Sequence, residues 1–402
     1  MTGLSETERA AVALVAAQPM LAQVERWAAV NSGTRNLVGP AAVAAMLVEA
    51  FGTLPGEIAL VAGDTAESVG ADGVVTVLDH GKHLHLVVRP EAAVQLLLTG
   101  HMDTVYPADH AFQALTWLDD GTVIGPGVAD MKSGLAVMLA ALTAVEASPL
   151  ATRIGYEVVI NSDEETGSFS STGLIAAAAR GKVAALTYEP ALPDGTLAGA
   201  RGGTGNFSIV VTGRSAHAGR NPDEGRNAIV ATSELAVRLF ALRSPTLAVN
   251  PARIEGGGPN NVVPDHAILR INFRPADHAE IARAQAALDR IVAEVAALLD
   301  VQIAVHGSFN RPPKPIDPGA AKLFALVKDC GADLGLDIAW RATGGVCDGN
   351  TIAACGVPVV DTMGARGGAI HSPDEYLIVD SLAERAALSA LTILRIAEKG
   401  AL

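Results

Sequence analysis

The chain has 402 residues, of which 50% are hydrophobic and only 4% aromatic, and it carries a formal net charge of −14. A chain of this length usually exceeds a single hydrophobic core, so we expect two domains. The negative charge argues against nucleic acid or an anionic membrane surface as the main partner, and any anionic substrate must meet local positive charge.

The chain begins with segments that favour helices, at 5–30 and at 40–50. Ser5-Glu6-Thr7-Glu8 is typical of an acidic helix start and not of a signal peptide, which opens with basic residues. No apolar stretch approaches the ~20 residues that span a bilayer without charges or Gly and Pro breaks. The three cysteines form no disulfide framework, and their odd number fits a reducing compartment. We therefore expect a cytoplasmic protein without a membrane or nucleic-acid partner.

Strand-like and helix-like segments alternate over the next part of the chain, which predicts an α/β layered domain. The expected strands are 57–61, 73–77, 83–88, 96–100, 156–162 and 183–188, and the expected helices are 132–145 and 171–180.

The pattern changes between about 202 and 310. Strands at 207–211, 246–255, 267–274 and 301–305 and helices at 224–242 and 277–299 give the order β-α-β-β-α-β, which is the ferredoxin-like arrangement. The proline-rich stretch 311–315 is typical of a return linker, and α/β character resumes from 319. We therefore predict one domain made of 1–201 and 312–402, with a smaller domain, 202–311, inserted into it.

Five residues of metal-ligand type stand where strand-like runs give way to turns marked by Gly or Pro: His101, Asp130, Glu165, Glu189 and His371. In an α/β sheet, ligands bind beyond the carboxyl ends of the strands. Two imidazoles and three carboxylates at such an edge suit a pair of zinc ions, and a two-metal site is a common device for hydrolysis.

Each signal taken alone has a structural alternative. His101 and Asp103 point to the same side of a strand, which suits a ligand histidine held by a carboxylate but also a histidine beside a solvated Asp. Asp130 can give one oxygen to each of two metals about 3.5–4 Å apart, or it can cap the helix that follows. The presence of all five residues in one chain favours the metal site.

Asp163-Glu164-Glu165 places three acids in succession after an apolar strand. Repulsion makes such a run costly unless a cation lies near, although a solvated acidic turn is the alternative. Within such a run, one carboxylate can bind metal while its neighbour takes a proton from water.

These motifs, with Gly100-His101-Met102-Asp103-Thr104-Val105-Tyr106-Pro107, resemble the zinc peptidase family of aminoacylases, acetylornithine deacetylases, succinyl-diaminopimelate desuccinylases and glutamate carboxypeptidases. The resemblance covers essentially the whole chain and is closest to the glutamate carboxypeptidase branch. It implies a zinc-exopeptidase-like catalytic domain and an inserted domain that forms a homodimer.

The resemblance also implies the roles of individual residues. His101, Asp130 and Glu189 would hold one Zn²⁺, and Asp130, Glu165 and His371 would hold a second, with Co²⁺ or Mn²⁺ as substitutes. Glu164 would be the general base and acid, and Asp103 the partner of His101. A cis peptide is implied at Asp130-Met131.

Two further segments refine the resemblance. The third ligand is Glu in carboxypeptidase, desuccinylase and acylase types, so Tyr188-Glu189-Pro190 argues against the acetylornithine deacetylase and tripeptidase types, which carry Asp. The segment Gly344-Gly345-Val346-Cys347-Asp348-Gly349-Asn350 is similar to the substrate-side loop, with Cys347 where Ser is common. A small buried residue is the alternative role for Cys347.

The inserted domain carries candidate substrate contacts. Gly213-Arg214-Ser215-Ala216-His217-Ala218-Gly219 resembles the motif of a histidine that reaches the partner subunit's active site; a loop histidine capping a helix near Pro222 is the alternative. Asn261 and Arg274 resemble positions that bind the substrate's terminal carboxylate, and an Arg fork matches that group. A surface charge is the alternative for Arg274, and Arg201 is a further candidate for the same task.

The sequence therefore predicts a di-zinc amide hydrolase that acts on an N-acyl amino acid or a short peptide and releases a C-terminal residue, with glutamate as the first expectation. An aminoacylase or desuccinylase with the same machinery is one alternative. A metal-dependent binding protein that has lost catalysis is another, against which the intact Glu164 speaks.

Overall fold

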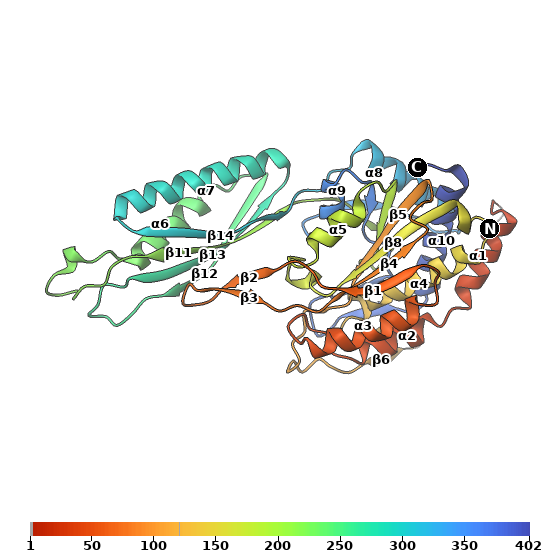
Figure 1. Cartoon of the computed structure of the whole chain (residues 1–402), viewed down its shortest axis with the longest axis horizontal. Coiled ribbons are helices and arrows are strands. Elements are labelled where there is room, and N and C mark those ends of the chain that lie inside the picture. The colour runs from red at the N-terminus through yellow and green to blue at the C-terminus, as the bar shows by residue number, and fades with distance from the viewer. Residues whose placement is uncertain (1–2, 120) are drawn as a thin grey trace.

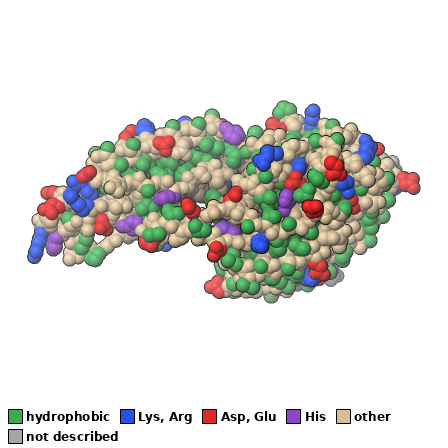
Figure 2. All heavy atoms as spheres, in the orientation of Figure 1, with side chains coloured by type: hydrophobic (Ala, Val, Ile, Leu, Met, Phe, Trp, Pro, Cys, Tyr) green, Lys and Arg blue, Asp and Glu red, His purple; other side chains and the backbone are tan. Residues whose placement is uncertain are grey.

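The computed structural model describes residues 3–119 and 121–402 and shows two lobes joined by a narrow waist (Figures 1 and 2). The larger lobe contains a six-stranded sheet in the order β1-β4-β8-β5-β9-β16. Its strands are β1 (Glu57–Val61), β4 (His83–Val88), β8 (Ile154–Asn161), β5 (Val94–His101), β9 (Ala184–Thr187) and β16 (Val359–Val360). The strands β8, β5, β9 and β16 run parallel, whereas β1 and β4 pair antiparallel.

Helices cover both faces of this sheet. One face packs against helices that enclose the main hydrophobic core: α1 (Glu6–Ala16), α2 (Met20–Ala28), α3 (Val38–Phe51), α4 (Ser133–Glu146), α8 (Pro318–Asp333) and α10 (Ser381–Lys399). The opposite face packs against α5 (Thr172–Ala179) and α9 (Asp348–Ala354) around a smaller core. On the central strand, Leu96 and Leu98 enter the first core and Leu97 the second, so its apolar run is buried on both sides.

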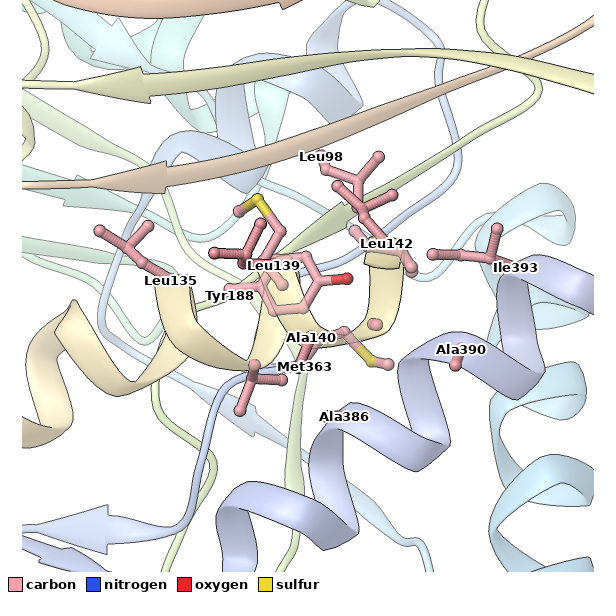
Figure 3. Packing of buried hydrophobic residues seen from close by; sticks show 14 of the residues in the cluster. Leu98, Leu135, Leu139, Ala140, Leu142, Tyr188, Met363, Ala386, Ala390 and Ile393 are labelled. Carbon is pink, nitrogen blue, oxygen red and sulfur yellow. The ribbon is translucent and has the colours of Figure 1, made fainter. Parts of the chain in front are cut away.

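Helix α4 lies between the sheet and α10 (Figure 3). Leu135, Leu139 and Leu142 of α4 meet Leu98 of the sheet and Ile393 of α10. The segment Val128–Glu146 has the length and hydropathy of a membrane span, but 94% of that window is buried inside the protein. Its position as a central core helix explains the apolar composition.

The smaller lobe is a four-stranded antiparallel sheet with two helices on one face (Figure 1). Its elements are β11 (Thr204–Thr212), α6 (Ala228–Phe240), β12 (Leu247–Gly256), β13 (His266–Pro275), α7 (His278–Leu299) and β14 (Gln302–Arg311). The spatial order β12-β13-β11-β14 confirms the predicted ferredoxin-like arrangement. The predicted domain limits lie between the end of β10 at Arg201 and the start of β11 at Thr204, and at the end of β14 at Arg311; the division into domains stays a prediction.

The remaining strands build three smaller sheets. A hairpin pairs β2 (Ala66–Val69) with β3 (Val75–Leu78), and β10 (Leu197–Arg201) pairs with β15 (Trp340–Thr343). The third sheet joins β17 (Gly367–Gly368), β18 (Tyr376–Ile378), β7 (Thr122–Ile124) and β6 (Thr116–Asp119).

Three predicted element bounds are wrong for local reasons. The single helical stretch 5–30 is two helices, because Pro19 has no N–H to donate and disfavours a helical residue before it. The helix expected from 224 starts at Ala228, where the Asn227 side chain accepts from the Val230 amide and caps it. The last strand of the inserted domain continues beyond Val305 to Arg311, because β11 pairs with it along that length.

Candidate active site

Three parallel strands of the main sheet end at the same edge and deliver the candidate ligands there. His101 is the last residue of β5, Glu165 lies in the short helical turn after β8, and Glu189 follows β9. Asp130 lies in a kinked segment before α4, and His371 lies in the loop between β17 and β18. Strand direction therefore brings His101, Glu165 and Glu189 together, as the sequence predicts, whereas Asp130 and His371 reach the same edge from other segments.

The side chains meet in two groups that share Asp130. His101 Nε2 lies 3.1 Å from Asp130 Oδ1 and 3.7 Å from Glu189 Oε2. His371 Nε2 lies 3.3 Å from Asp130 Oδ2 and 3.2 Å from Glu165 Oε2. The two oxygens of Asp130 thus face different histidines, as a carboxylate that bridges two cations must. One ligand atom from each of His101, Glu164 and Glu189 also lies within 4.8 Å of the other two, so Glu164 is within ligand range of the same ion.

Buried charge in the site is poorly balanced by protein groups alone. Burial raises the pKa of Glu165 to about 8, and the charge of Asp130 adds to the shift. Burial likewise raises the pKa of Glu189 to about 7. Hydrogen bonds to Asp130 and Glu165 raise the pKa of His371 to about 11. Crowded, buried carboxylates around two imidazoles form a donor set that fits two divalent cations.

Asp130 does not cap α4, so that alternative is wrong. The N-terminal flanking residue of α4 is Lys132, and it makes no side-chain capping bond. The peptide Asp130-Met131 is cis, as the resemblance implies.

The acidic run Asp163-Glu164-Glu165 is not a solvated turn, so that alternative is also wrong. Asp163 is fully buried, and the Glu164 and Glu165 side chains are only 9% and 5% exposed.

Asp103 contacts more than the histidine for which it was proposed. His101 Nδ1 lies 3.0 Å from the Asp103 main-chain oxygen and 3.5 Å from Asp103 Oδ1. The Asp103 carboxylate also accepts hydrogen bonds from the amides of Glu164 and Glu165, both at 3.2 Å, and from the Thr34 hydroxyl at 2.6 Å. It therefore fixes the acidic turn as well as the imidazole.

Glu375 is a residue that the sequence interpretation missed. Its Oε1 accepts hydrogen bonds from the amides of Ala129 and Asp130, both at 3.0 Å, and its Oε2 accepts one from the Tyr106 hydroxyl at 2.9 Å. The side chain is buried and holds the main chain of Asp130 in place. Tyr106 belongs to the motif 100–107, but no local signal marks a glutamate 245 positions from Asp130.

We expect Glu375→Ala to lower metal affinity about 10–100-fold, the range seen when residues that orient metal ligands are lost. Glu375→Gln keeps an amide oxygen that can accept the same two amide protons, so it should retain more of the affinity. The measurement is bound metal per subunit during titration with a competing chelator. Asp374→Ala, at the exposed neighbouring position, is the matched control; equal loss in both Ala variants would contradict the assignment.

Arg311 is a second residue that the sequence interpretation missed, because 311–315 was assigned to a linker. It ends β14, and its Nη2 lies 2.7 Å from Glu164 Oε1 and 3.3 Å from Asp348 Oδ1. The same nitrogen donates to the Ser168 hydroxyl at 2.7 Å. A buried guanidinium thus stands against the carboxylate proposed to transfer protons.

Two pockets border the acidic cluster. The first has a volume of about 310 Å³, and Cys347, Arg201 and Arg341 contribute to its wall. The second has a volume of about 360 Å³, and Arg274 and Arg311 contribute to its wall. Both pockets share Glu164, Glu165 and His371.

The two arginines proposed to bind the substrate's carboxylate differ in exposure and in their protein partners. Arg274 is exposed on β13, and its Nε donates to Asn272 Oδ1 at 2.9 Å. Arg201 is buried, and its fork donates to Asp361 at 2.7 and 3.2 Å. Its positive charge therefore already has a protein partner.

His217 lies in the loop between β11 and α6, and Asn261 lies in the loop between β12 and β13. Because β11 starts at Thr204 beside the acidic cluster and runs away from it, both loops lie at the far end of the inserted domain (Figure 1). Both are exposed, and the two segments meet through a hydrogen bond from the Ala218 amide to the Asn261 oxygen at 3.0 Å. His217 Nδ1 accepts from the Gly219 amide at 3.1 Å. The structure brings these two residues together but does not bring them to the site of their own subunit.

The α/β sheet, the inserted ferredoxin-like domain and the acidic cluster define a metal-dependent peptidase or amidohydrolase. The chain belongs to the peptidase family M20/M25/M40, whose model matches residues 97–395.

Among characterised relatives, the chain is similar to carboxypeptidase G2 of Pseudomonas sp. (strain RS-16), with 30% identity over 315 residues, 76% of this chain and 75% of that protein. It is also similar to a succinyl-diaminopimelate desuccinylase of Verminephrobacter eiseniae, with 26% identity over 278 residues, 65% of this chain and 68% of that protein.

Solved structures share the fold. An M20 family metallo-carboxypeptidase from Sulfolobus solfataricus superposes with a TM-score of 0.70 at 15% identity, covering 94% of this chain and 100% of that one. A tripeptidase from Staphylococcus aureus gives 0.70 at 23% identity, covering 94% and 98%. These matches confirm the predicted fold class, and the family model confirms the predicted family.

Proposed function

We propose that this enzyme hydrolyses the amide bond of an N-acyl amino acid or short peptide and releases the C-terminal amino acid. The observation that carries the proposal is the pocket in which Arg274 and Arg311 stand beside Glu164, because it places positive charge next to the group proposed to transfer protons. The similarity to carboxypeptidase G2 supports the same reaction. Glutamate is the residue that we expect to be released.

Two zinc ions are the cofactors that we propose, with Co²⁺ or Mn²⁺ as possible substitutes. His101, Asp130 and Glu189 would hold one, and Asp130, Glu165 and His371 the other, matching the two groups of close contacts. When bound, the pair supplies Lewis acidity to water and to the scissile carbonyl.

Glu164 is the group that we assign to proton transfer. It would take a proton from the attacking water and deliver it to the nitrogen of the leaving amine. Burial raises the pKa of Glu164 to about 8, which suits a carboxylate that must both accept and donate a proton near neutral pH. Arg311 holds this carboxylate at 2.7 Å and restricts its position.

The direct test is hydrolysis with and without metal. We expect release of a ninhydrin-reactive amino acid from a panel of N-acyl amino acids and dipeptides, ranked by kcat/KM. A chelator should abolish the release and added zinc should restore it. Metal binding without any release across the panel would favour a binding protein that has lost catalysis.

Arg274→Ala should raise KM for substrates with a free C-terminal carboxylate and leave the matching C-terminal amides nearly unchanged. A charge-assisted pair contributes only where a carboxylate exists, and its loss corresponds to roughly a tenfold change or more. Steady-state kinetics on each acid and amide pair measures this. Equal loss on both would show that Arg274 is structural.

A desuccinylase-like specificity is the second candidate, and the first pocket favours it. The lining of this pocket includes four carboxylates, two arginines (Arg201 and Arg341) and the apolar side chains of Leu192, Ala198 and Ile370. Arg201 and Lys314 both pair with Asp361, at 2.7 and 3.1 Å, so two buried cations share one carboxylate beside the pocket. An acyl chain that ends in a carboxylate would match this excess of positive charge, and N-succinyl substrates in the panel would then rank above N-acetyl ones.

We further propose that the enzyme is a cytoplasmic homodimer. The loops that carry His217 and Asn261 lie at the end of the inserted domain away from the acidic cluster of their own chain (Figure 1), and the resemblance assigns His217 to the partner's site. The outer strands β12 and β14 of the four-stranded sheet are edges through which two copies can pair. The cysteines at 330, 347 and 355 are free, which fits a reducing compartment.

A further inference from the structure

The hairpin formed by β2 and β3 reaches out of the catalytic lobe and lies against the inserted domain (Figure 1). Within residues 3–119 and 121–402, its two strands pair with each other and join no larger sheet. Val74 and Val77 are 54% and 65% exposed, so the hairpin is not part of the catalytic core. An isolated two-stranded hairpin is marginally stable in water, so its contacts with the inserted domain determine whether it stays in place.

Arg270 of β13 makes the main polar contact. Its Nη2 donates to the main-chain oxygens of Val69 at 2.8 Å and Gly70 at 3.3 Å. The guanidinium is itself held inside the inserted domain, because Nε pairs with Glu255 at 2.8 Å and Nη1 donates to the Ser208 hydroxyl at 2.7 Å. It therefore presents a fixed donor to the hairpin.

Apolar and close-packed contacts surround this bond. Val69 of the hairpin packs with Val210 and Ile268 in a small buried cluster. At the hairpin turn, Gly73 has φ +79°, and a Cβ there would lie 2.8 Å from His266 and 3.0 Å from Val210. The turn thus approaches the inserted sheet as closely as a glycine allows.

The same face of β13 carries the contacts with the hairpin and the residue proposed to bind substrate. Side chains alternate along a strand, so Ile268, Arg270, Asn272 and Arg274 form one row. The intervening side chains of β13 enter the opposite core, against α6 and α7. Within this row, Asn272 Oδ1 accepts a hydrogen bond from Arg274 Nε.

The covalent connections between the lobes lie side by side near one point, where Asn310 also donates to the Gly167 oxygen at 3.1 Å and Arg311 contacts Glu164. The Arg201 amide donates to the Lys314 oxygen and the Lys314 amide to the Arg201 oxygen, both at 2.9 Å. Two adjacent linkers restrain translation but leave rotation about that point. A distant contact such as the hairpin would restrain the rotation as well.

We propose that the β2–β3 hairpin braces the inserted domain, and that Arg270 is a positioning residue that keeps Arg274 at the mouth of the active site. The expected effect on KM rests on the proposed role of Arg274 in binding substrate. The effect of the hairpin on the orientation of the inserted domain does not depend on that role and can be measured separately.

Two variants break the contact from opposite sides. Arg270→Gln removes the donor, and replacement of 67–77 by Asn-Gly shortens the hairpin at the paired residues Ala66 and Leu78. We expect KM for carboxylate substrates to rise about tenfold in both, with kcat within about twofold, amide substrates nearly unchanged and bound metal unaltered. Arg253→Gln is the matched control, because Arg253 pairs with the same Glu255 at 3.0 Å but is 70% exposed.

A variant that carries both Arg270→Gln and the shortened hairpin distinguishes loss of the hairpin contact from general destabilisation of the protein. If Arg270 acts through the hairpin, Arg270→Gln should have no further effect on KM once the hairpin is shortened. Full additivity of the two effects would overturn the proposal.

Small-angle X-ray scattering of the full-length variants tests the orientation directly. We expect both variants to show a broader distribution of lobe separations than the parent and Arg253→Gln. Unchanged scattering in both variants would also overturn the proposal. A broadened distribution together with an inert Arg274→Ala would instead support the brace and contradict the carboxylate-binding role of Arg274.

Discussion

Glu164→Gln should retain both metal ions and the fold but lose roughly 10²–10⁴-fold in kcat, the range that general acid–base catalysis supplies. The substitution removes the proton-accepting group and nearly preserves its shape. Glu164 is buried beside Arg311, so Gln also replaces a charged partner of a buried guanidinium. Circular dichroism and the thermal midpoint must therefore be measured with the kinetics.

Glu165→Gln is the comparison that separates proton transfer from ligation. Glu165 lies 3.2 Å from His371 Nε2, in the group around the second oxygen of Asp130. We expect this variant to lose metal, measured by elemental analysis after dialysis. Near-normal turnover in Glu164→Gln would remove Glu164 from the mechanism, and unchanged metal content in Glu165→Gln would remove Glu165 from the ligands.

The sequence predicts those parts of the site that follow from strand direction. His101, Glu165 and Glu189 each follow an apolar run, and parallel strands end at a common edge, so chain order is enough to bring them together. Asp130 is predicted because its glycine-rich turn precedes a strongly apolar helix.

Residues that act through tertiary contacts escape such an analysis. Glu375 supports Asp130 through main-chain amides, and Arg311 meets Glu164 only because β14 returns to the lobe boundary. Neither residue has a neighbour in sequence that marks its role. Arg201 shows the converse case, since a cation expected to bind substrate is paired with Asp361, which is 160 positions away.

In the inserted domain, too, the sequence predicts the regular elements but not the features that depend on tertiary contacts. Its βαββαβ order is visible in the periodicity, because the four strands and two helices each have a regular apolar pattern. The β2–β3 hairpin is only half predicted, since 73–77 was expected as a strand but its partner 66–69 was not. A short strand with exposed residues carries little pattern, and its position is set by the contact with β13.

The proposed role of His217 conflicts with its position in a single copy of the chain. The loop that carries His217 lies at the end of the inserted domain, whereas the acidic cluster lies at the sheet edge of the catalytic lobe (Figure 1). A role in stabilising the oxyanion of the reaction therefore requires a second copy of the chain or a large domain movement. Loss of one such donor costs about 10²–10³-fold in kcat, so His217→Ala should be almost inactive in either case.

Mixing inactive subunits distinguishes the two cases. A heterodimer of Glu164→Gln and His217→Ala subunits, if each site takes His217 from the partner, contains one site with both lesions and one with neither. With random subunit exchange half of the dimers are mixed and each has one intact site, so we expect activity to return to about a quarter of the parent value. If His217 serves its own subunit, every site keeps one lesion and activity stays at the level of the inactive parents. Exchange must be shown independently, for example by native mass spectrometry of subunits with different tags. Inactive mixtures with proven exchange would then place His217 in its own subunit's site or outside the mechanism.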